Sequence, residues 1–265
     1  MHRLVQLLWR IARHPRPYRA TIADFAWRRM SAERPNPAYR HCVSAGAALA
    51  GALGESGITI VEFGVAGGNG LVALEQTAGA VENATGLRVD VVGFDSGVGM
   101  PVPDGYRDLP YKWGAGYYPM NEPALRARLK RARLLLGPVA ETAPVFASEC
   151  RFPVAAVMMD LDYYSSTLAA LQILDAAPTL PRVSLYFDDL WAATPYTGEW
   201  GAINEYNRSH QMQKLVQTWD LAHADGWRAQ VFELHKFEHP DYCRRLTTLD
   251  RDGQLPLADR HHAKS

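Results

Sequence analysis

The stretch VEFGVAGGNG, residues 61–70, decides the fold. It closes an apolar run that begins at Ile58 and predicts a buried strand, and a helical run over 71–81 follows it. Between the two, glycines let the backbone turn tightly and approach a ligand closely. These glycines are Gly64, Gly67, Gly68 and Gly70. No Lys-Ser/Thr pair follows, so the turn is not a P-loop. It fits a dinucleotide site, another phosphate-contacting loop or a plain tight turn.

Strand-like and helical runs alternate along most of the chain. The strands are predicted over 58–65, 88–95, 154–160, 183–189 and 227–237, and the helices over 71–81, 122–133, 165–177 and 198–212. Such alternation predicts an α/β fold, in which helices cover both faces of a mostly parallel sheet. We divide the chain into a helical N-terminal extension (1–56), an α/β domain (57–247) and a polar C-terminal tail (248–265).

The composition argues against some classes of function. The 28 basic and 28 acidic side chains leave a formal net charge of zero, so we do not expect a dedicated nucleic-acid binder. The cysteines, Cys42, Cys150 and Cys243, are far apart and form no C-x-x-C pair, which favours reduced thiols and a cytoplasmic location. No apolar run is long enough to span a bilayer.

The first residues of the chain predict an amphipathic helix. Its apolar face carries Leu4, Leu7, Leu8 and Ile11. We expect this face to pack on the domain or on a second subunit, which makes a homodimer compatible with the sequence. Attachment to a membrane surface is the alternative.

Acidic residues gather at the ends of the predicted strands. They are Glu62, Asp95, Asp160 and the adjacent pair Asp188 and Asp189. Ligands of open parallel sheets bind outside the carboxyl ends of the strands. Four strands are therefore predicted to bring carboxylates to one ligand-binding edge.

These acids have two interpretations. Asp160 and Asp162 are two residues apart, so they would point the same way in an extended chain, and Asp188 and Asp189 end the neighbouring strand. Converging carboxylates form an all-oxygen site that suits Mg²⁺ and does not suit zinc. Alternatively, an acid after a strand caps the next helix, which stays open for Asp162. Capping does not explain two adjacent acids together with a third on the next strand.

Asp95 ends the strand that follows the glycine turn, where a carboxylate commonly bonds a ribose diol. Nicotinamide cofactors and S-adenosylmethionine both carry such a ribose. This residue alone therefore leaves an oxidoreductase and a methyl-transfer enzyme open.

Three motifs together resemble a known family. VEFGVAGGNG, GFDSGVGMP at 93–101, and MDLDYYSSTLAAL at 159–171 with YFDDL at 186–190 resemble the class I S-adenosylmethionine-dependent methyltransferases, and most closely their macrocin O-methyltransferase branch. The resemblance covers about residues 57–210. It implies a Rossmann-like, doubly wound sheet of seven strands, the last of them antiparallel.

The resemblance also implies a site. The glycine turn with Glu62 behind it would hold the amino-acid end of S-adenosylmethionine, and Asp95 would hold its ribose. With the residues expected to line the same pocket, the full set of expected cofactor residues is Glu62, Gly64, Gly67, Gly68, Asn69, Asp95, Ser96 and Glu141. Mg²⁺ or another hard divalent cation is implied on Asp160, Asp188 and Asp189, and a general base at Asp162.

The sequence departs from the branch at three positions. Leu161 stands where glycine is usual between the two aspartates, Val98 replaces an acidic residue, and Pro138 stands where aspartate is common. None of these is a proposed ligand. Together they indicate a divergent subfamily, whose acceptor does not follow from the better-known members.

The implied activity is Mg²⁺-dependent O-methylation of a small-molecule hydroxyl, on a sugar, a glycosylated natural product or a similar diol. A catechol-type enzyme, a non-catalytic adenosylmethionine-binding protein and, less in keeping with the later acids, a nicotinamide oxidoreductase are the alternatives. Aromatic loops over 104–119 and 191–200 are expected to cover a substrate or to form small satellite cores.

Overall fold

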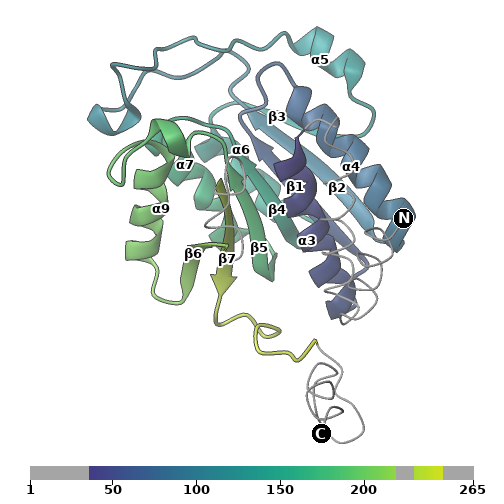
Figure 1. The fold of residues 1–265 in the computed structure, drawn as a ribbon. Helices are drawn as coiled ribbons and strands as arrows, with labels where there is room; N and C mark the ends of the chain where they lie inside the picture. The colour runs from purple at the N-terminus through teal and green to yellow at the C-terminus, as the bar shows by residue number, and fades with distance from the viewer. Residues whose placement is uncertain (1–35, 219–229, 247–265) are drawn as a thin grey trace, which may run out of the picture.

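The structure, a computed structural model, describes residues 36–218 and 230–246. A seven-stranded sheet in the order β3-β2-β1-β4-β5-β7-β6 forms its centre (Figure 1). The strands are β1 Gly57–Phe63, β2 Arg88–Asp95, β3 Arg133–Leu136, β4 Val154–Met159, β5 Thr179–Phe187, β6 Gln213–Gln217 and β7 Val231–Lys236. Strands β1 to β5 are parallel and β7 is antiparallel to both of its neighbours. The predicted Rossmann-like, mostly parallel sheet is confirmed.

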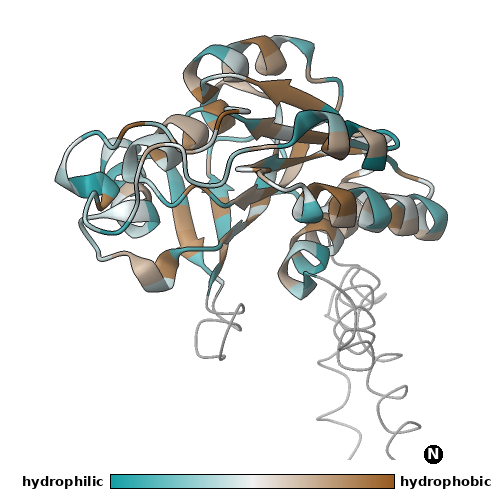
Figure 2. Cartoon of the chain, turned by 90° about the horizontal axis from the view of Figure 1, so that it is seen from above, coloured by the Kyte–Doolittle hydropathy of each residue, from teal (hydrophilic) through white to brown (hydrophobic). Residues whose placement is uncertain are grey.

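Helices cover both faces of the sheet, as predicted. They are α3 Pro37–Leu53, α4 Asn69–Thr85, α5 Glu122–Arg128, α6 Val139–Glu149, α7 Tyr164–Leu171, α8 Ile173–Ala176 and α9 Gly198–Ser209, with short 3-10 turns at Tyr106–Asp108 and Leu190–Ala192. Helices α3 and α4 share one apolar core with the sheet, and α6 to α9 share the other. Strands β1 and β4 are buried along their whole length, which explains why they are mostly apolar; Thr59 and Glu62 are the polar exceptions in β1. Much of the sheet is brown in Figure 2, whereas the helices around it mix brown and teal.

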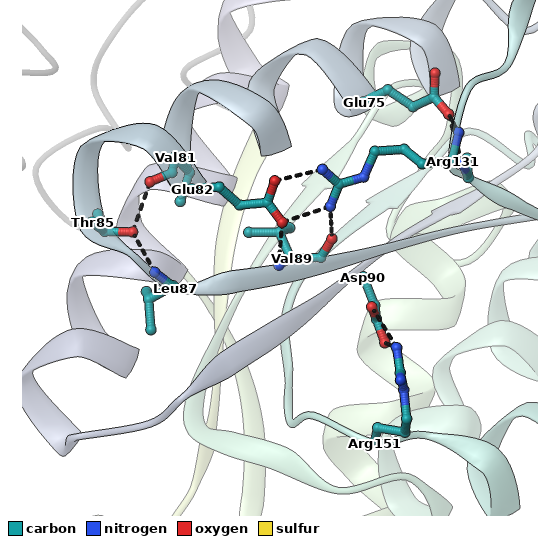
Figure 3. Close-up of polar contacts among 10 residues, drawn as sticks. Glu75, Val81, Glu82, Thr85, Leu87, Val89, Asp90, Arg131 and Arg151 are labelled. Atoms are coloured by element: carbon teal, nitrogen blue, oxygen red, sulfur yellow. Dashed lines mark hydrogen bonds and ion pairs between the residues drawn. The ribbon is translucent and has the colours of Figure 1, made fainter.

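Two short strands, β3 and β6, were not predicted from the sequence. The helix predicted over 122–133 ends at Arg128, and the chain turns to become β3. The buried carboxylate of Glu75 on α4 causes this turn, because it accepts the backbone N–H groups of Lys130, Arg131 and Ala132 at 2.6–3.0 Å. Figure 3 shows Glu75 beside Arg131. The helix predicted over 165–177 is likewise divided, into α7 and α8, at Gln172.

Helix α3 is the described part of the N-terminal extension. It lies close to β4 because Gly46 has no side chain: a Cβ there would lie 2.7 Å from the carbonyl oxygen of Ala155. This approach brings Tyr39, near the start of α3, to the ligand-binding edge of the sheet. The predicted amphipathic helix at Leu4–Ile11 and the predicted tail, 248–265, lie outside the described residues. In the described part of the chain no helix is long and apolar enough to cross a membrane.

Candidate active site

The carboxyl ends of the parallel strands are held level by hydrogen bonds that continue past each strand. The N–H of Gly64 donates to the backbone carbonyl of Phe94 and that of Gly137 to the backbone carbonyl of Asp95, each at 2.9 Å. The N–H of Asp160 donates to the carbonyl of Phe63 at 3.0 Å. The N–H of Asp188 reaches Met159 at 3.0 Å in the same way. The residues that follow each strand therefore form one continuous edge. The long loop between β2 and α5 arches over it (Figure 1).

The glycine turn depends on the absence of a side chain at Gly64. Its φ is +83°, and a Cβ there would lie 1.8 Å from the carbonyl oxygen of Asp160. The turn at the end of β1 can thus lie directly against the end of β4. Ala66 in the same turn has a φ of +43°, which few non-glycine residues adopt. The turn therefore requires glycine at residue 64 for two reasons: the end of β4 lies too close for a side chain, and the backbone has a positive φ.

Glu62 is buried behind this turn and one of its oxygens has no partner. Oε1 accepts the hydroxyl of Tyr39 at 2.9 Å, whereas Oε2 has no hydrogen bond within the described residues. Burial raises the pKa of this carboxyl well above its ordinary value. A Cβ on Gly70 would lie 1.8 Å from Oε1, so a glycine is required there for Glu62 to fit. A buried acceptor without a donor is costly, and the cavity beside it has room for one.

Asp95 ties the glycine turn to the turn that follows β2. Its Oδ2 accepts the N–H of Ala66 at 2.8 Å, and its Oδ1 accepts the N–H of Gly97 at 2.7 Å. Each carboxylate oxygen has a second lone pair, so a ribose diol can still be bound. Ser96, next to it, donates its hydroxyl to the carbonyl of Gly99 at 2.6 Å.

Two adjoining cavities open along this edge. The smaller, of about 370 Å³, is lined by Tyr39, Glu62, Asn69 and the glycine turn. The larger, of about 740 Å³, is lined by Asp95, Ser96, residues 137–140, Asp162, Asp189 and aromatic side chains. Gly64, Ala66, Asp160 and Asp188 line both. The predicted cofactor residue Glu141 lies on the exposed side of α6 and lines neither cavity.

An acidic cluster lies where the two cavities meet. Oxygen atoms of Asp160, Asp162 and Asp189 lie within 4.8 Å of one another. Asp188 is not in this set, because its Oδ1 accepts the hydroxyl of Tyr186 at 2.6 Å. The structure thus brings Asp162 into the place that the resemblance gives to Asp188.

Asp162 reaches the cluster through a turn. Strand β4 ends at Met159, and Asp162 has a φ of +58°, so its carboxylate does not arrive there by the alternation of an extended chain. The start of α7 is capped by a different acid: Asp108 accepts the N–H and the hydroxyl of Ser165 at 2.8 and 2.6 Å. The carboxyl of Asp162 instead hydrogen-bonds that of Asp189.

The cluster holds more negative charge than its surroundings neutralise. Burial, followed by repulsion from Asp188 and Asp189, raises the pKa of Asp160 to about 7. Burial and Asp189 raise the pKa of Asp162 to about 8, and burial also raises that of Asp189. Lys112 acts in the opposite direction on Asp189. Without a bound cation, Asp160 and Asp162 would therefore retain protons near neutral pH.

The aromatic loops have mixed roles. Trp113, Tyr117, Tyr118 and Trp191 line the larger cavity, as expected of a substrate cover. The Nζ of Lys112 lies 4.4 Å from the ring centroid of Trp191 and 5.3 Å from that of Trp113, so it joins the two loops. Trp200, in contrast, packs against Phe232 in the core, with ring centroids 5.5 Å apart.

Tyr39, Lys112, Tyr186 and Glu199 also lie at the site, and the sequence alone did not identify them as site residues. Tyr39 lies in the helical N-terminal extension, more than twenty residues before the glycine turn, so nothing in the sequence links it to the site. Glu199 is an acid in the first turn of a helix, a position usually explained by the helix dipole. Only its complete burial distinguishes it.

The residues present fit both groups that the resemblance implies. The unpaired Oε2 of Glu62 beside the glycine turn suits a cofactor that carries an ammonium group. Three carboxylates within 4.8 Å, with raised pKa values, suit a hard divalent cation.

Solved structures of known proteins have a fold similar to that of this chain. CalS11, a calicheamicin methyltransferase, aligns with a TM-score of 0.52 and 25% identity over 72% of this chain and 77% of its own. The O-methyltransferase NovP aligns with a TM-score of 0.51 and 19% identity over 75% of this chain and 77% of its own, a likeness of fold alone. No protein-family model matches the chain, and no curated protein matches it significantly.

Proposed function

We propose that this chain, a divergent class I S-adenosylmethionine-dependent methyltransferase, methylates a hydroxyl oxygen of a small molecule with the help of Mg²⁺ or another hard divalent cation. The meeting of the two cavities at Asp160 carries the proposal, because it places a cofactor pocket beside a cluster of carboxylates. The acceptor we propose is a sugar, a glycosylated natural product or a similar diol. The likeness to a calicheamicin methyltransferase supports a natural product as the methyl acceptor.

The cofactor would lie along the edge of the sheet. Its ammonium would pair with the free oxygen of Glu62, which Tyr39 holds in place, and its ribose would bond Asp95. The backbone of the glycine turn would follow the cofactor closely, since Gly64 presents no side chain. S-adenosylmethionine supplies the electrophilic methyl group, and the protein's task is to orient it.

The acids would orient and deprotonate the acceptor. Asp160 and Asp189 would hold the cation, joined by Asp188 once it leaves Tyr186, and Asp162 would stay free to act as the base. A bound divalent cation lowers the pKa of an alcohol hydroxyl. Asp162 would then accept the hydroxyl proton, and the aromatic loops would exclude water from the larger cavity.

Titration calorimetry with S-adenosylmethionine, with and without Mg²⁺, tests the proposal first. We expect micromolar cofactor binding and a separate Mg²⁺ isotherm. Absence of cofactor binding under both conditions would show that a shared fold has been taken for a shared function. Binding of the cofactor without turnover on any panel of sugars, diols and phenols would favour a non-catalytic binding protein. Turnover restricted to phenols would favour the catechol-type alternative.

Replacement of Asp162 by Asn is expected to lower turnover by about 10²- to 10⁴-fold, the usual contribution of a general base. Cofactor affinity should change little, because the cofactor contacts proposed above do not include Asp162. Measuring kcat at saturating Mg²⁺ separates loss of the base from weaker cation binding. Turnover at the wild-type level under those conditions would exclude Asp162 as the base.

A further inference from the structure

We infer that Glu199 is a positioning residue that sets the spacing of the acidic cluster. Its side chain is completely buried at the start of α9 and lines neither cavity. The inference rests on the proposed function, because it assigns a role in holding the residues of the proposed cation site.

Glu199 joins the two segments that carry the acids. Its Oε2 accepts the N–H of Asp189 at 2.9 Å, and its Oε1 accepts the N–H of Leu161 at 3.4 Å, the longer of the two. Leu161 lies between Asp160 and Asp162 in the sequence. One carboxylate therefore holds the backbone after β4 and the backbone after β5 at a fixed separation, which determines how closely Asp160, Asp162 and Asp189 converge.

The surrounding chain is shaped to bring Glu199 to this point. Gly198 has a φ of +56°, and a Cβ on it would lie 2.8 Å from the Cβ of Ala193 and 3.3 Å from the carbonyl oxygen of Asp162. The first turn of α9 can therefore lie directly against the turn that carries Asp162. An acid that served only the helix dipole would not need to be buried or to bond two other segments.

The ordinary alternative is a purely structural glutamate, and the chain offers one for comparison. Glu75 is also a buried carboxylate that accepts backbone N–H groups, those of residues 130–132. It lies on α4, outside both cavities and outside the acidic cluster. Glu75→Gln therefore applies the same chemical change where no cation site is involved.

The test is calorimetric titration of Mg²⁺ into the full-length wild type, Glu199→Gln, Glu199→Asp and Glu75→Gln. Glutamine keeps the length of the side chain but replaces one acceptor oxygen by an NH2 group, whereas aspartate keeps both acceptor oxygens but is one methylene shorter. We expect both Glu199 variants to bind Mg²⁺ about 10- to 100-fold more weakly, as is usual when a group that orients a metal ligand is changed. Glu75→Gln should bind Mg²⁺ like the wild type, and both Glu199 variants should keep cofactor affinity.

Three outcomes would overturn the inference. Wild-type Mg²⁺ affinity in both Glu199 variants would make Glu199 a structural residue only. Weak binding by Glu199→Gln with full binding by Glu199→Asp would mean that the two acceptor oxygens matter and the spacing does not. Absence of Mg²⁺ binding by the wild type itself would remove the cation from the proposed function, and this role with it. Should Glu199→Gln not fold, Glu199→Asp alone tests the spacing: weaker Mg²⁺ binding supports the inference and wild-type binding overturns it.

Discussion

Mg²⁺ affinity is expected to fall by at least about 100-fold when Asp160 is replaced by Asn, the upper end of what is typical for a change around a metal site. Asp160 belongs to the cluster seen in the structure and to the ligand set implied by the resemblance, so the expectation holds for either set. Cation-dependent turnover should fall with the affinity. Calorimetry and initial rates at several Mg²⁺ concentrations measure both.

Asp160→Asn weakens Mg²⁺ binding, but it is expected to raise the free energy of unfolding of the metal-free protein at alkaline pH. The pKa of Asp160 is about 7 in the folded chain and about 3.9 in an unfolded one. The folded state therefore holds a proton that the unfolded state releases between these values. The resulting stabilisation is complete below pH ~4 and is lost as pH rises through ~7, a change on the order of 1–4 kcal/mol.

An asparagine in place of this acid does not titrate, so at pH 8 without metal the Asp160→Asn variant should be more stable than the wild type. Added Mg²⁺ should raise the unfolding temperature of the wild type alone. Asp90→Asn is the control, because Asp90 lies away from the site. Its carboxylate forms an ion pair with Arg151, with an N–O distance of 3.0 Å (Figure 3). Equal Mg²⁺ affinity in wild type and Asp160→Asn would remove Asp160 from the cation site.

The fold was predictable because its signals are local. Strands β1 and β4 are mostly apolar and buried throughout, and the glycine turn follows directly after β1, so the alternation of strand-like and helical runs indicated a covered parallel sheet. Strand β3 escaped prediction because its start depends on Glu75, more than fifty residues earlier, which accepts the N–H groups ahead of it. A contact at that separation leaves no mark on the local pattern.

The site was predictable to a lesser degree, for the same reason. The acids at the strand ends could be placed on one edge from topology, but the way each carboxylate points could not. Asp162 enters the cluster through a left-handed turn, and one carboxylate oxygen of Asp188 is bound by the hydroxyl of Tyr186. Both depend on side-chain packing between strands. The sequence could not identify Glu199 as a site residue, because only its burial distinguishes it from an ordinary acid in the first turn of a helix, and burial depends on the tertiary structure.

Gly64→Ala is expected to destabilise the protein by several kcal/mol, at the upper end of single substitutions. The new Cβ would lie 1.8 Å from the carbonyl oxygen of Asp160 in a backbone conformation with φ +83°. Neither partner can move easily, because the N–H of Gly64 donates to Phe94 and that of Asp160 donates to Phe63. Any relief would displace Asp160 from the cluster, so cofactor and cation binding should be lost together.

Gly67→Ala, in the same turn, separates this effect from a general intolerance of glycine replacement. A Cβ on Gly67 meets no described atom within 4 Å, so its free energy of unfolding should stay within about 0.5 kcal/mol of the wild type. Urea unfolding measures both variants, and calorimetry then compares their cofactor affinities. If Gly64→Ala were as stable as Gly67→Ala, the turn and the end of β4 would not be in the close contact that links the cofactor pocket to the acids.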